Sequence, residues 1–386
     1  MKNMKKLTVL MLMFASVFFF ACEDDSSDQL SKEEVKTELN NLGSDMSGYM
    51  EEMMNSDGIA AMDDLMALMA LDDPFTDVKF TKSSVIPNIK KYLLPVNPEK
   101  NQKSAYEAEP FNFDLWVGTY DWDAAHNMWV PNFGNPSDKI ILNFPTEGSA
   151  TNNATITIHN YDEVMVTYYD DYYQTNIEDY YPTDILADLY INDVKIVEID
   201  LNATWETTGD AVGDPSSFDI SVYLVPFEFT GTFNHTATAA SIDFAINYDG
   251  TSIFSAGVDA TFANSDFDSP LTIGGYLQLL AVKIEATVDV NGIETIFEQL
   301  EAQTSPYTTI EELTNAINDE IDATVYVDGT KAADIEIQYN ETAEEMITIV
   351  LVFEDGTTEP AEPYFEDFVT DIEDFFYFID DIYVDW

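Results

Sequence analysis

Arginine does not occur in this chain of 386 residues, and lysine supplies its 15 basic side chains against 73 aspartates and glutamates. The formal net charge at pH 7 is therefore -58. Nucleic-acid binding depends on basic side chains that displace the counterions of the phosphates, so nucleic acids are excluded as partners. A chain without guanidinium groups also lacks the paired donors that hold phosphates, which argues against enzymes of phosphorylated substrates.

Cysteine and histidine are also scarce: the chain has one cysteine and three histidines. The single cysteine, Cys22, excludes a disulfide within the chain and leaves no second thiolate for a metal site. The histidines lie in separate segments, and no nucleophile elbow, phosphate-binding glycine loop or zinc-protease motif occurs. These absences favour a non-catalytic protein that has no resident cofactor and is stabilised by packing alone.

The N-terminus has the design of an export signal. Three lysines, Lys2, Lys5 and Lys6, precede an apolar run of about 14 residues, which suits a signal-peptide core and is shorter than a membrane-spanning helix. The small residue Ala21 directly precedes Cys22, as in the lipobox of bacterial lipoproteins. Residues 1–21 are therefore predicted to be a signal peptide, and Cys22 the lipidated first residue that anchors the mature protein in the outer membrane. An ordinary secretory signal is the alternative.

Composition divides the mature chain into three parts. Hydrophobic residues make up 46% and aromatic residues 13% of the chain, which is too rich for disorder, so the acidic side chains coat a folded body. We predict a flexible acidic tether over residues 22–30 and a helical segment with a pinned linker over residues 31–110. An antiparallel β domain with late helices is predicted over residues 111–386.

Two amphipathic helices are predicted before the linker. The first opens at a capping box that starts at Ser31, and its apolar residues recur every three or four positions as far as Met53. The second follows Asp57 and ends before Pro74. Their apolar faces are rich in methionine, which packs well against irregular surfaces. We expect these faces either to pack directly on the sheet or to form a lid over a hydrophobic cavity.

From Phe111 onward the apolar residues recur at every second position, which is typical of antiparallel strands with one buried face. Turn dipeptides between these runs predict hairpins at 192–193, 249–250, 291–292, 328–329 and 355–356. Late helices are predicted around 293–300, after a capping box at Thr309, and over 365–382. The predicted fold is mainly β, of the α+β type: a large antiparallel sheet or half-barrel of successive hairpins with N-terminal and C-terminal amphipathic helices packed on it.

Aromatic and acidic residues alternate in a stretch that is a candidate ligand site. Rings beside carboxylates suit the faces and hydroxyl groups of sugars, although strand rings packed in a core are the alternative. Asp121 and Asp123 are also candidates for a weakly bound calcium ion, but the stretch lacks the glycine and terminal glutamate of an EF-hand loop. A tyrosine-rich stretch over 168–181 allows the same two interpretations. The candidate glycan-binding residues are Trp116, Tyr120, Trp122 and Trp129.

The whole layout resembles the cell-surface lipoproteins of Bacteroidetes bacteria. Glu23, Asp24 and Asp25 are similar to the acidic export signal that follows the lipidated cysteine in that family, and residues 111–144 and 181–183 are similar to stretches of its members. The resemblance implies surface exposure without an established activity. In enteric bacteria an acidic residue two places after the cysteine implies retention at the inner membrane instead. At fold level alone, hairpins with amphipathic helices resemble the half-barrel lipid carriers of bacterial envelopes.

We therefore predict a lipid-anchored, non-catalytic envelope protein that binds a hydrophobic ligand or an envelope partner, or has a structural role. A glycan-binding surface lipoprotein is the alternative. A glycoside hydrolase is a third and less favoured interpretation. Among 73 acids two will lie at glycosidase separation by chance, so paired carboxylates do not identify such an enzyme.

Lipidation at Cys22 is directly testable. Radiolabelled palmitate should enter the protein in cells, and the Cys22→Ser change should abolish labelling because it removes the only thiol. Labelling that is absent, or that persists in Cys22→Ser, would contradict the anchor.

Overall fold

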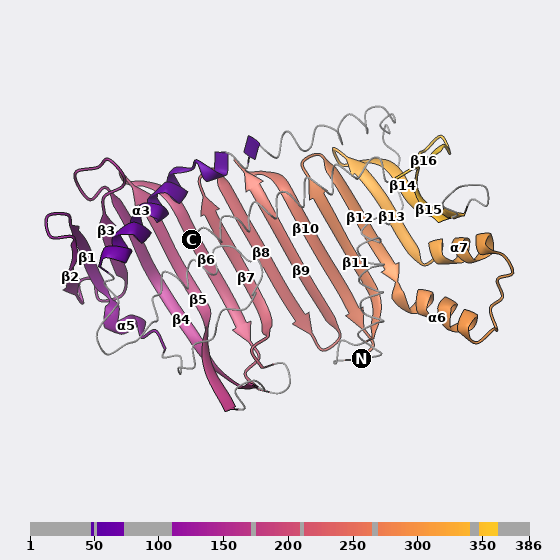
Figure 1. The fold of residues 1–386 in the computed structure, drawn as a ribbon, viewed down its shortest axis with the longest axis horizontal. Helices are drawn as coiled ribbons and strands as arrows, with labels where there is room; N and C mark the ends of the chain where they lie inside the picture. The colour runs from indigo at the N-terminus through magenta and orange to yellow at the C-terminus, as the bar shows by residue number, and fades with distance from the viewer. Residues whose placement is uncertain are drawn as a thin grey trace. The chain divides into compact units, whose positions relative to one another are not determined.

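A computed structural model describes residues 48–49, 52–72, 110–170, 175–208, 212–264, 269–339 and 347–361. Sixteen strands form one mixed sheet made mostly of hairpins, with few helices, which confirms the predicted mainly β fold (Figure 1). The described helices are α3 Asp57–Leu71, α5 Phe113–Trp116, α6 Val290–Glu301 and α7 Ile310–Asn318. The strands are β1 Gly118–Asp123, β2 Met128–Phe133, β3 Ile140–Phe144, β4 Ala154–Asp170, β5 Thr175–Ile191, β6 Val194–Trp205, β7 Pro215–Leu224, β8 Phe227–Thr236, β9 Ala239–Tyr248, β10 Thr251–Phe262, β11 Pro270–Leu279, β12 Val282–Asp289, β13 Ile321–Val327, β14 Thr330–Tyr339, β15 Ile347–Val352 and β16 Thr358–Pro360.

Strand order follows chain order except at one end. From β16 to β3 each strand lies beside its predecessor in the chain, but the order ends β3, β1, β2. The pairing of β1 with β3 is parallel, whereas β1 with β2 and β3 with β4 are antiparallel. The chain divides into two compact units, a first unit of Met50–Asn234 with Ile246–Thr251 and a second unit of Met1–Tyr49, His235–Ala245 and Ser252–Trp386.

Two-residue turns of the predicted type join several hairpins. Asn192 and Asp193 have φ values of 49° and 65°, Asp249 and Gly250 have 48° and 77°, and Asp328 and Gly329 have 51° and 75°. Positive φ at both turn positions gives a twist that matches the paired strands. These three hairpin predictions are confirmed.

The hairpin predicted at Asn291-Gly292 is wrong. These residues lie in the first turn of α6, where the carboxylate of Asp289 accepts a hydrogen bond from the backbone N–H of Gly292 at 2.8 Å. A side chain that satisfies a free N–H at a helix start favours the helix over the turn. The following apolar residues, including the buried Ile296, then continue the helical period.

The strands separate apolar from polar side chains between two faces. On β6, Ile199, Leu201 and Ala203 are buried, while Asp200 and Asn202 between them are exposed. Successive side chains of a strand point to opposite faces, so this alternation gives the sheet of the first unit one apolar and one polar face.

Helix α3 packs directly on the apolar face of the first unit. The hydroxyl of Ser56 caps its start by accepting the N–H of Ile59 at 3.4 Å, and its buried residues are Gly58, Ala61, Leu65 and Met69. A Cβ atom at Gly58 would lie 2.2 Å from Cδ1 of Leu224 on β7. The backbone of α3 therefore lies so close to β7 at Gly58 that no side chain fits between them, which is core packing rather than a lid over a cavity.

Edge strand β2 is protected against pairing with another chain. The backbone N–H of Trp129 donates to the carboxylate of Asp72 at 2.7 Å, just after α3 ends. Pro131 lies two residues further along the same edge and has no N–H to offer. A capped donor and a proline leave little of the hydrogen-bonding template that an open edge presents.

The late helices form largely as predicted, and several other predicted segments lie outside the described residues. Thr309 caps α7 by accepting the N–H of Glu312 at 3.1 Å. The segments outside the described residues are the signal peptide, Cys22 with Glu23, Asp24 and Asp25, most of the first helix, the linker over 73–109 and the C-terminal helix over 365–382.

Truncation of Leu65 should destabilise the first unit. Leu65 lies on the buried side of α3, and its side chain is 0% exposed. Leu65→Ala should lower the free energy of unfolding by about 2 to 5 kcal/mol, because it removes buried apolar surface and leaves a cavity. Leu71 on the same helix is 66% exposed, and Leu71→Ala should change the value by less than about 0.5 kcal/mol. Urea denaturation followed by circular dichroism measures both, and equal effects would contradict the packing of α3.

Candidate functional site

The aromatic residues expected to bind a glycan lie mostly in the core. Tyr120, Trp122 and Trp129 are 1%, 6% and 3% exposed, and the rings of Trp122 and Trp129 meet edge to face at 5.4 Å. Trp116 is half-buried and its carbonyl oxygen accepts the hydroxyl of Tyr120 at 2.7 Å. A glycan-binding surface of exposed rings is therefore not formed by these residues, because the β1 and β2 rings point to the buried face.

Burial raises the pKa of Tyr120 to about 12, consistent with a phenol held inside the fold.

Asp121 and Asp123, the calcium candidates, are engaged by neighbouring side chains. Asp121 accepts the amide of Asn143 at 2.8 Å, and Asp123 lies 2.7 Å from the ring of His126. Hydrogen bonding from His126 and from the backbone of Ala125 lowers the pKa of Asp123. Among the residues that the structure describes, no three acids or histidines gather closely enough to hold a metal ion.

The described parts of the tyrosine-rich stretch, residues 168–170 and 175–181, belong to a two-stranded ribbon at the end of strands β4 and β5. Both strands have 17 residues, but β3 pairs with β4 only over residues 154–158 and β6 pairs with β5 only over residues 184–191. The remaining parts pair only with each other and extend past their neighbours (Figure 1). At the ribbon base Tyr181 packs on Trp205 with ring centroids 4.7 Å apart.

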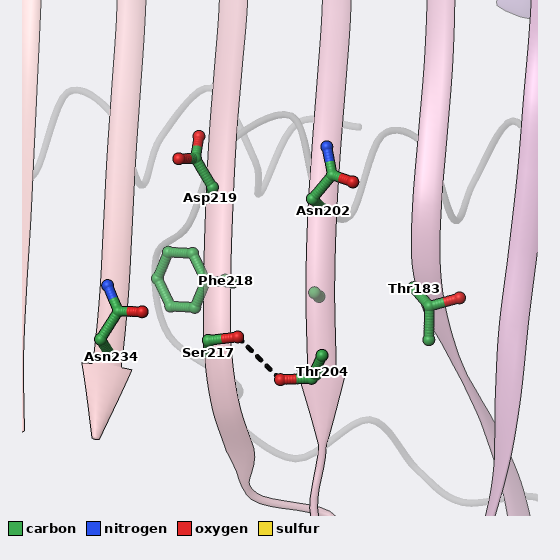
Figure 2. Close-up of a pocket in the computed structure, with 8 residues that line it drawn as sticks. Thr183, Asn202, Thr204, Ser217, Phe218, Asp219 and Asn234 are labelled. Atoms are coloured by element: carbon green, nitrogen blue, oxygen red, sulfur yellow. Dashed lines mark hydrogen bonds between the residues drawn. The ribbon is translucent and has the colours of Figure 1, made fainter. Parts of the chain in front are cut away.

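A groove opens beside this ribbon base, on the polar face of the first unit. Its volume is about 230 Å³. Figure 2 shows that its polar side chains come from four neighbouring strands, β5 to β8. The groove is lined by Thr183, Asn202, Ala203, Thr204, Ser217, Phe218, Asp219 and Asn234.

Strand register builds the groove from residues that are distant in sequence. Asn202 lies opposite Asp219, and Thr204 lies opposite Ser217. Ser217 in turn lies opposite Asn234 on β8. Directly opposed residues share a face of the sheet, so two amides, two hydroxyls and a carboxylate meet on one surface.

Hydrogen bonds fix part of the groove and leave the rest to solvent. The hydroxyls of Thr204 and Ser217 are 2.7 Å apart (Figure 2), and the amide of Asn202 donates to Asp200 at 3.2 Å. The side chains of Asn202, Asp219 and Asn234 are exposed. The site therefore offers both donors and acceptors in a partly ordered arrangement.

Carboxylates crowd the floor next to the groove. Burial raises the pKa of Asp200 above its ordinary value, and the negative charges of Asp184, Asp219 and Glu198 raise it further. Lys195, further along β6, forms an ion pair with Glu198. The groove thus lies in a negative field.

Other perturbed or paired groups of the first unit lie outside the groove and hold the fold. Burial raises the pKa of Glu163, which accepts the N–H of Phe111 at 2.6 Å and the hydroxyl of Tyr161 at 3.0 Å. His159 lies 2.7 Å from the carboxylate of Asp188. Glu163 thereby anchors the start of the β domain to β4.

The chemistry of the groove makes it a candidate binding surface. Amides, hydroxyls and a carboxylate on a shallow floor suit a ligand with many hydroxyl groups. No motif in the sequence singles out this groove, although Asn, Asp, Ser and Thr at positions 202, 204, 217, 219 and 234 mark the polar face of their strands. Only the pairing register of β6, β7 and β8 shows that these positions lie next to each other.

No family model, curated protein or solved structure matches this chain.

The carboxylate crowding predicts a specific pH dependence of stability. A carboxyl whose pKa is raised by folding stabilises the fold fully below its unfolded pKa, and this stabilisation is lost as the pH rises through the folded pKa. Asp200→Asn should therefore raise Tm at about pH 7, and the gain should shrink towards zero at about pH 3.

Thermal unfolding at several pH values measures this difference. Asp249→Asn removes the same charge at an exposed hairpin turn with positive φ, which asparagine also tolerates, and is the matched control. A lower Tm for Asp200→Asn than for the parent protein at neutral pH, or a gain in Tm that persists at acidic pH, would contradict the predicted repulsion between Asp200 and its neighbouring carboxylates.

Proposed function

We propose that this protein is a lipid-anchored, surface-exposed, non-catalytic binding protein whose ligand is a glycan held in the groove across β5 to β8. The observation that carries the proposal is the convergence of amide, hydroxyl and carboxylate side chains from four strands on one open surface. Sugars present alternating hydroxyl donors and acceptors, which amides and carboxylates match in pairs.

The groove favours a hydroxyl-rich ligand over an apolar one. Asn202, Thr204 and Asp219 line it with exposed polar groups, whereas a carrier of hydrophobic ligands needs an apolar cavity. The close packing of Gly58 and Leu65 on the apolar face supports a filled core under α3. A glycan ligand therefore accounts for the first unit better than a lipid does.

The anchor completes the proposal. Lipidation of Cys22 would hold the body at the outer membrane, and the acidic residues after it would direct it to the cell surface. None of the described helices has the length and apolar character needed to cross a bilayer. The tether over 22–30 would separate the groove from the membrane.

Asn234→Ala tests the glycan site. It removes one amide from the groove wall, so affinity for the polysaccharide that binds best should fall about 5- to 10-fold. Asn132→Ala removes an exposed asparagine from edge strand β2 and should leave affinity unchanged. Isothermal titration calorimetry with a panel of soluble polysaccharides provides the measurement.

Two outcomes would overturn the proposal. Absence of binding to every polysaccharide in the panel would remove the glycan function. Release of reducing sugars during the titration would remove the non-catalytic assignment and favour a hydrolase.

A further inference from the structure

The polar side chains of the groove form rows that run across the strands. One row consists of Asp184, Asn202, Asp219 and Thr232, each directly opposite the next; Asn202 and Asp219 line the groove, and Asp184 and Thr232 continue the row on either side of them. A second row consists of Thr204, Ser217 and Asn234. Each strand thus contributes one polar side chain to a row.

Resting on the proposed glycan function, we infer that the ligand is an uncharged linear polysaccharide that lies across strands β5 to β8 and contacts several sugar units at once. The two rows give such a chain a repeated set of contacts, whereas a single sugar would meet only part of either row.

The spacing of the strands sets the length of ligand that can contact a whole row. Neighbouring strands lie about 4.8 Å apart, so the row from Asp184 on β5 to Thr232 on β8 spans three intervals, or about 14 Å. One sugar ring covers about one interval. Simultaneous contact with Asp184 and Thr232 therefore requires an oligomer.

The side chains along β6 indicate that the polysaccharide runs across the strands rather than along one of them. Along β6 from Asn202 the same face continues to Asp200 and Glu198, where the surface becomes acidic. In the other direction β6 ends at Trp205, whose indole N–H donates to the carbonyl of Pro182 at 2.8 Å. A chain along a strand would leave the mixed polar surface, whereas a chain across the strands keeps the amide of Asn202 and the hydroxyl of Thr232 beside the carboxylates of Asp184 and Asp219.

Charge sets the ligand class. Asp184, Asp200 and Asp219 lie on this face, and each adds to the negative potential that a ligand meets. Lys195, the cation on the same face of β6, is paired with Glu198. Uronate or sulfate groups would be repelled by the carboxylates, so the sugar units are uncharged.

Oligosaccharides of graded length test the inference on the full mature chain. The probes are two- to six-unit oligomers of glucan, mannan and xylan, with polygalacturonate as the anionic comparison. Affinity for the best series should rise at least about 10-fold from two to four units and then level off. Polygalacturonate should bind at least about 10-fold more weakly.

Thr232→Ala, at the β8 end of the longer row, provides the matched variant. It should reduce the gain in affinity between two and four units, and Asn132→Ala, on edge strand β2, should leave both the disaccharide affinity and this gain unchanged. Glycan binding that does not depend on length, or tighter binding of polygalacturonate, would overturn this inference and leave the proposed function standing. Failure of all the oligosaccharides and their parent polysaccharides to bind would overturn the proposed function itself.

Discussion

The alternation of side chains along each strand is the constraint on which the rest of the structure depends. A strand turns successive residues to opposite faces, so an apolar residue at every second position gives one buried and one wet face. On β6 this places Ile199 and Leu201 against the core and Asp200 and Asn202 on the other side. Both α3 and the groove use this division: the helix covers the apolar face, and the groove lies on the polar face.

The lack of arginine shapes how the acidic residues are satisfied. Several carboxylates of the first unit accept hydrogen bonds from neutral donors: Asp72 from the N–H of Trp129, Asp64 from the N–H of Glu147, and Glu52 from the hydroxyl of Tyr248. These three acids lie on or beside α3 and join it to separate parts of the first unit. Hydrogen bonds to ionised acceptors are stronger than neutral ones, so they help to fix the helix without ion pairs.

Local patterns were predicted from the sequence where neighbouring residues decide the outcome. The turns at 192–193, 249–250 and 328–329, the helix after Asp57 and the cap at Thr309 all depend on residues within a few positions of each other. Asn291-Gly292 failed because a second local signal, the carboxylate of Asp289, competed with the turn and capped a helix. Such competition between two short-range signals is hard to resolve from pattern alone.

The candidate site shows the opposite limit. Trp122 and Trp129 stood out in the sequence as a ligand surface, yet they meet each other inside the fold because β1 and β2 pair with both rings on the buried side. Asn202, Asp219 and Asn234 did not stand out, yet register brings them together. A periodic sequence shows that a strand has two faces but not which of them an aromatic cluster occupies.

The sequence by itself determined the strand periodicity, most of the turns and the scarcity of basic groups, because each of these depends on residue type and short spacing. Only the tertiary structure decided which face each ring occupies and which polar residues share a surface. Pairing between strands is a long-range choice made by the whole sheet, and a slip of one strand by one residue would move the groove side chains of that strand to the other face.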